Sequence, residues 1–71
     1  MNEEKRKKLI TALETTIDEL VRNAALDEGR ANSALSLGET ELAAAYEQCC
    51  KQARLMADYL RVDLAHILTA P

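Results

Sequence analysis

The chain contains no tryptophan and no phenylalanine, and only two tyrosines, two glycines and one proline stand among its 71 residues. Strand-favouring and turn-forming residues are therefore scarce, whereas eleven leucines and twelve alanines favour helix. This composition predicts an all-α protein. A single domain of this size with few bulky side chains has a marginally stabilising core. Such a core gains stability from oligomerisation or from docking on a partner.

Long apolar runs are also missing. No run of about 18 or more apolar residues exists that could form a membrane-spanning helix. The charged segment 1–8 is not followed by the apolar region of a secretory signal. A net charge of −3 gives no general attraction to nucleic acid or to anionic membranes. We therefore expect a cytoplasmic protein without a membrane partner, in which the adjacent Cys49 and Cys50 stay reduced.

Patterns that carry catalysis or metal binding are missing too. His66 is the single histidine, and no serine or cysteine stands at an interpretable spacing from it, so nucleophilic catalysis is not expected. Cys49, Cys50 and His66 lack the spacing of zinc ligands. The two glycines do not form a phosphate-binding loop. We expect neither an enzyme nor a cofactor nor a metal site, and we expect Cys49 in the core with Cys50 at its edge.

Apolar residues recur at helical spacing in the first part of the chain, which predicts a helix over about residues 3–26. The pattern fails just before Gly29, which is a candidate for a left-handed helix stop. Residues 27–36 are then expected to form the connection. The predicted stripe consists of Leu9, Ile10, Leu13, Ile17, Leu20, Val21 and Ala24.

A second helix is predicted over about residues 37–69. Ser36 and Glu39 have the spacing of a capping box, although Thr40 is an alternative cap one turn later. Asp63 is an alternative cap for a short third helix over residues 64–69. The predicted inner seam consists of Leu42, Tyr46, Cys49, Ala53, Met56, Leu60, Leu64 and Ile67.

Folding the chain back through its connection predicts an antiparallel helical hairpin as a single domain over residues 1–71. Small residues gather at the connected end, where the backbones can approach closely. The apolar stripe of the first helix ends at Leu9. Leu60 and Leu64 would therefore extend past it, opposite the basic segment 5–8, and leave an apolar open end.

The second helix also carries an apolar stripe on its far side, formed by Leu55, Tyr59, Val62 and His66. One interpretation is that the connection covers this stripe with Leu26, Leu35 and Leu37. The connection lies at the other end of the hairpin, however, so we favour cover by another protein.

These patterns predict an interaction module of the adaptor, co-chaperone or small-inhibitor type that docks through the apolar end of the second helix. The partner is another protein, or a second copy with which two hairpins would form a four-helix bundle. The alternative is a dimeric nucleic-acid-binding regulator in which the basic cluster Lys5, Arg6, Lys7 and Lys8 contacts phosphates. The predicted partner-binding residues are Leu55, Tyr59, Leu60, Val62, Leu64, Ile67 and Leu68.

Overall fold

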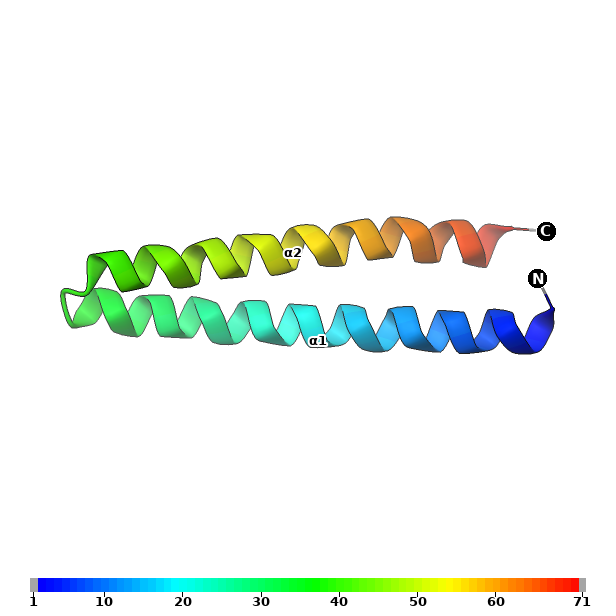
Figure 1. The fold of residues 1–71 in the computed structure, drawn as a ribbon, viewed down its shortest axis with the longest axis horizontal. Helices are drawn as coiled ribbons and strands as arrows, with labels where there is room; N and C mark the ends of the chain where they lie inside the picture. The colour runs from blue at the N-terminus through cyan, green and yellow to red at the C-terminus, as the bar shows by residue number, and fades with distance from the viewer. Residues whose placement is uncertain (1, 71) are drawn as a thin grey trace.

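Two long helices make up the hairpin. The computed structural model describes residues 2–70, in which α1 (Glu3–Ser36) and α2 (Thr40–Thr69) are joined by residues 37–39. The helices run antiparallel and pack along their length, so that both chain ends lie at the same end of a rod (Figure 1). Its principal extents are 53 × 15 × 11 Å. The all-α, two-helix fold predicted from the sequence is thereby confirmed.

The start of α1 is fixed by a side-chain cap. The side-chain oxygen of Asn2 accepts a hydrogen bond from the backbone N–H of Lys5 over 2.8 Å. Glu3 and Glu4 occupy the first turn, where negative charge interacts favourably with the helix dipole. The predicted start near residue 3 is therefore correct.

The predicted end of the first helix is wrong. α1 continues through residues 27–36, so this segment is helix rather than connection, and Gly29 lies inside it. Asp27 stands at a partly buried position, where its carboxylate pairs with the Arg30 guanidinium at 3.1 Å. The ion pair with Arg30 thus allows Asp27 to occupy a seam position that an apolar residue would otherwise fill, and α1 continues past it.

Gly38, rather than Gly29, is the residue in the left-handed conformation, with φ of 76°. The Gly38 N–H donates to the Leu35 carbonyl over 3.0 Å, and the Glu39 N–H donates to the Ala34 carbonyl over 2.9 Å. This pair of bonds is a Schellman motif, which ends α1 and satisfies two of its last carbonyls.

The predicted capping box at the start of the second helix does not form. The Ser36 hydroxyl donates to the Asn32 carbonyl within α1, and the Glu39 side chain makes no capping bond. α2 begins at Thr40, three residues later than expected, and continues through Asp63 to Thr69. The residues described by the structure therefore contain no separate third helix.

The core is a single seam between the two helices. Its members recur at steps of three and four residues in both helices, which is the spacing of an antiparallel coiled coil. The two series mirror each other about the turn, so each α1 member has a counterpart on α2. They are Ile10, Leu13, Ile17, Leu20, Ala24, Asp27, Ala31 and Ala34 on α1, and Ala43, Tyr46, Cys50, Ala53, Ala57, Leu60, Leu64 and Ile67 on α2.

Three of the eight residues of the predicted α2 seam are displaced by one position. Ala43, Cys50 and Ala57 are buried, whereas the structure exposes the three residues expected there, Leu42, Cys49 and Met56. The expected locations of the two cysteines are thus reversed. Alanine and cysteine on the inside allow the helix backbones to approach more closely than leucine and methionine would, which improves packing along the seam.

Core side chains become larger toward the open end of the hairpin. The seam consists mainly of alanines near the turn and of leucines and isoleucines near the termini, and the two ribbons diverge in the same direction (Figure 1). The Arg6 guanidinium donates to the Ile67 carbonyl over 3.3 Å, so α1 reaches the end of α2. The predicted overhang of Leu60 and Leu64 is therefore wrong, because α1 is long enough to face them.

Candidate partner-binding surface

The outward side of α2 carries a continuous surface without charge. Its residues follow one another at steps of one and three, so they occupy one sector of the helix over about 30 Å of its length. All of them are exposed. We call this surface the α2 strip: Leu42, Ala45, Gln48, Cys49, Gln52, Leu55, Met56, Tyr59 and Val62.

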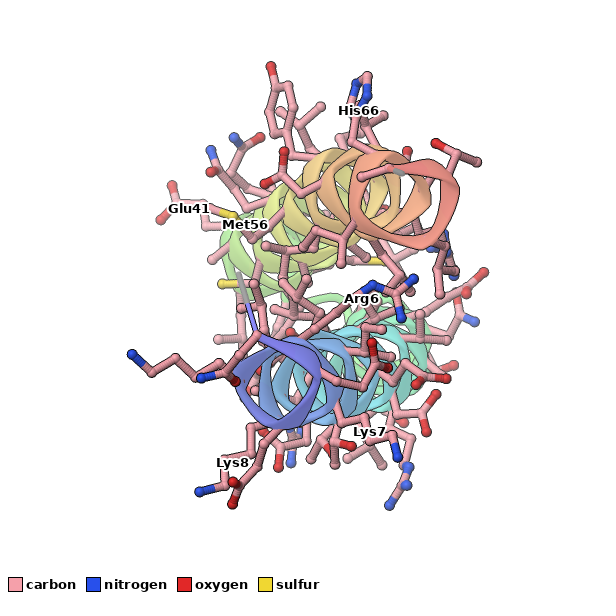
Figure 2. The ribbon with its side chains drawn as sticks, turned by 90° about the vertical axis from the view of Figure 1, so that its right-hand side faces the viewer. Arg6, Lys7, Lys8, Glu41, Met56 and His66 are labelled. Atoms are coloured by element: carbon pink, nitrogen blue, oxygen red, sulfur yellow. The ribbon has the colours of Figure 1, made fainter. Side chains whose placement is uncertain are left out.

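Four large apolar side chains are concentrated in the second half of the α2 strip. Leu55, Met56, Tyr59 and Val62 are each more than half exposed, with Tyr59 at 61%. Residues separated by three and four positions are neighbours on a helix surface, so these side chains form one patch. Figure 2 shows Met56 on one flank of the hairpin, away from Arg6 and Lys7 on the other.

The opposite flank of α2 is charged. The Arg54 guanidinium donates to the Glu28 carboxylate of α1 over 2.7 Å, and Arg61 pairs with Asp58 at 3.1 Å. The hydrogen bond to Glu28, with a smaller contribution from Cys50, raises the pKa of Arg54 above its ordinary value. This flank is solvated, and of its two ion pairs only Arg54–Glu28 joins α2 to α1.

The structure separates the seven predicted site residues into three locations. Leu55, Tyr59 and Val62 lie together on the α2 strip. Leu68 is exposed on the charged flank. The other three, Leu60, Leu64 and Ile67, belong to the half-buried seam against α1.

Met56 belongs to the exposed patch but was assigned to the core by its spacing. The signal that could have placed it is the alternative series Ala43, Cys50, Ala57 and Leu64, which recurs every seven residues and excludes Met56 from the inside.

Within residues 2–70, no other segment covers the patch. The proposed cover by Leu26, Leu35 and Leu37 is wrong, because the first two lie on α1 and the third in the turn, and all three are themselves exposed. An open hollow of about 490 Å³ is lined by Leu26 and Leu37 and also by Leu42 and Tyr46 of α2. At the turn end, therefore, the apolar surface continues from the α2 strip onto α1.

Within residues 2–70, neither the groove on the charged flank nor any cluster of metal-binding side chains supports a small-molecule or metal site. The charged flank holds a groove of about 200 Å³ between Glu28, Cys50 and Arg54, which is smaller than the roughly 300 Å³ at the lower end of ligand pockets. No group of three histidine, cysteine, aspartate or glutamate side chains in this part of the chain could hold a metal ion. Neither α1 nor α2 is both long and apolar enough to span a bilayer.

The basic segment is partly engaged within the hairpin. Arg6 lies 3.5 Å from Glu3 and also donates to the Ile67 carbonyl, and Lys8 lies 3.6 Å from Glu4. Lys7 projects from the lower part of α1 in the end-on view (Figure 2). Phosphate contact by the segment Lys5–Lys8 stays a prediction.

No protein-family model matches this chain, and neither a curated protein nor a solved structure matches it. The residues that bear on function are therefore those on the surface of the hairpin.

Proposed function

We propose that this protein is a non-enzymatic interaction module that binds another protein chain through the α2 strip. The observation that carries the proposal is an uncharged, exposed helix sector with four large apolar side chains, Leu55, Met56, Tyr59 and Val62. Contiguous apolar patches of this kind mark interaction sites on soluble proteins. The outward positions Thr11, Thr15, Asp18 and Arg22 of α1, by contrast, are polar.

The chemistry of the patch suits helix-in-groove recognition. Anchors at i, i+4 and i+7, here Leu55, Tyr59 and Val62, are the pattern by which an amphipathic helix binds an apolar groove. Each such side chain contributes about 1.5–3 kcal/mol when it becomes fully buried. Tyrosine and methionine are enriched at the centres of interfaces. Adaptors, co-chaperones and small inhibitors use this mode of binding.

The test uses a double variant, Tyr59→Asp with Val62→Asp, and a matched control, Thr11→Asp with Thr15→Asp on the outward side of α1. Circular dichroism should show full helicity for both proteins, because all four positions are exposed. A photo-reactive residue placed at Met56 should form a cross-link to another chain in the wild type and in the control, and should lose it in the double variant. If the double variant unfolds as a monomer, the strip belongs to the core and the proposal fails.

A further inference from the structure

The hairpin exposes more surface than a compact protein of its mass. Its accessible surface is 5311 Å², whereas a folded monomer of 7.9 kDa exposes about 4400 Å². The radius of gyration is 16.1 Å, against about 11 Å for a compact chain of this length. The excess of about 900 Å² is close to the roughly 800 Å² that each partner buries in a stable interface of standard size.

We propose that the occupant of the α2 strip is a second copy of this chain, bound antiparallel, so that the two α2 helices form the centre of a dimer. The inference depends on the proposed function, because it takes the α2 strip as the docking surface. One hairpin has a single such strip, and a symmetric dimer covers both strips in one contact.

The middle of the α2 strip complements itself when a second copy runs antiparallel. Its central residues recur at alternating steps of three and four, the spacing needed for side-by-side helix packing. They are Ala45, Gln48, Gln52, Leu55, Tyr59 and Val62. Matching this series end to end places Val62 opposite Ala45 of the second copy, and Leu55 opposite Gln52. Tyr59 then lies opposite Gln48, whose amide can bond with the phenol. In each of these three pairs, a large side chain packs against a smaller or more flexible one.

Charges beside the strip favour the same register. Lys51 makes no ion pair within residues 2–70, and antiparallel packing brings it next to Asp58 of the second copy. At both ends of the contact, Glu41 faces His66 of the second copy, and Figure 2 shows His66 on the side of α2 away from α1. A parallel dimer would instead place Lys51 of one copy and Asp58 of the other on opposite sides of the contact, so this pair could not form.

The first measurement is the mass of the full chain in solution, by sedimentation equilibrium over a concentration series. We expect a dimer of twice 7.9 kDa for the wild type and for the Thr11→Asp, Thr15→Asp control. The Tyr59→Asp, Val62→Asp variant should be a helical monomer. A wild type that stays monomeric at all concentrations overturns the inference, as does a double variant that stays dimeric.

Failure of this inference is distinguishable from failure of the proposed function. In a monomeric wild type, a cross-link from position 56 to a different protein, lost in the double variant, would keep the α2 strip as a docking surface and exclude the second copy as its occupant. In a dimeric wild type, a cross-link from position 56 to the same chain supports both.

Cysteine cross-linking tests the orientation. With Cys50→Ala as background, the antiparallel register separates the two Cys49 residues by about 13 Å along the helix axis. It places position 56 beside Cys49 of the second copy. Mild oxidation should therefore give a covalent dimer for Met56→Cys in the Cys50→Ala background. The Cys50→Ala protein itself, with Cys49 as its single cysteine, should give very little covalent dimer, because disulfides need Cβ atoms about 4 Å apart. Efficient oxidation of the protein with Cys49 as its single cysteine would show that the two Cys49 residues lie close together, which overturns this antiparallel register.

A charge exchange tests the register without touching the apolar patch. Lys51→Asp should raise the dimer dissociation constant by about two- to thirtyfold, because two symmetric surface pairs become repulsive. Adding Asp58→Lys should restore the wild-type constant. No change in Lys51→Asp, or no rescue in the double exchange, contradicts this register.

Discussion

The Arg54 guanidinium of α2 lies 2.7 Å from the Glu28 carboxylate of α1, and the two form the one side-chain ion pair between the helices within residues 2–70. At the open end, Arg6 donates to the Ile67 carbonyl. Together these contacts show that the helices stay in register from the middle of the hairpin to its termini. The same contacts place α1 against Leu60 and Leu64, so that these two residues belong to the half-buried seam.

Arg54→Glu is expected to destabilise the hairpin slightly, because it places two carboxylates side by side. The loss of thermal stability should be larger at low salt than at high salt, since both groups are exposed and screened. The exchange Glu28→Arg with Arg54→Glu should restore the midpoint. A salt-independent loss would indicate disturbed packing instead of charge repulsion.

Gly29→Ala is expected to stabilise the protein by about 0.5–1 kcal/mol, because the glycine lies inside α1 and a methyl group there meets nothing within 4 Å. The melting temperature should rise by several degrees, as measured by circular dichroism. A clear loss of stability would contradict a continuous α1 and would favour a helix break at Gly29.

Gly38→Ala should have the opposite effect and serves as the comparison. Gly38 has φ of 76° in the turn, a conformation that costs about 1–2 kcal/mol for a residue with a Cβ atom. An unchanged melting temperature would show that the Schellman motif is not needed to end α1.

Ala57→Leu is expected to destabilise the hairpin by about 1–3 kcal/mol, because Ala57 is 0% exposed and the helices would have to separate to fit a larger side chain. Ala65→Leu is the matched control on an exposed position of the same helix, and it should change the free energy of unfolding by less than about 0.5 kcal/mol. Chemical denaturation measures both. Equal effects would contradict the close approach of the helices at Ala57.

The two cysteines are expected to differ in reactivity although they are neighbours in the chain. Cys49 is exposed and Cys50 is buried in the seam. At low micromolar protein concentration, a Cys50→Ser variant should react with a thiol reagent at the rate of an accessible thiol. A Cys49→Ser variant should react at least about tenfold more slowly, because its thiol becomes accessible only on local opening. Equal rates would contradict the burial of Cys50.

The fold class could be predicted from the sequence, but the boundaries of the helices could not. Helical spacing and composition are local properties, and they predicted two antiparallel helices correctly. The extension of α1 through Asp27 depends on pairing with Arg30 and on the continued seam of Ala31 and Ala34. Both are tertiary or pairwise effects, and they outweigh the weak breaking tendency of Gly29.

The candidate surface could be predicted in part. Leu55, Tyr59 and Val62 were recognised because no other part of a hairpin can cover the far side of α2, and the structure leaves them exposed. Leu60, Leu64 and Ile67 belong to the predicted site because the sequence predicts a first helix that ends ten residues earlier than α1 does. Met56 was missed because its spacing fits a helical seam as well as that of Ala57 does, and a pattern of apolar residues does not distinguish the two.

Composition and helical spacing are enough to predict that this protein is helical, that it folds back once, and that its second helix is apolar on two sides. Which of the apolar residues form the core depends on how the two helices pack. Ala43, Cys50 and Ala57 are small enough to let the two backbones approach, so they are buried, and the larger Leu42 and Met56 are left on the surface. Hydrophobicity determines which residues can be buried, and side-chain size and shape determine which of them are buried when the helices pack.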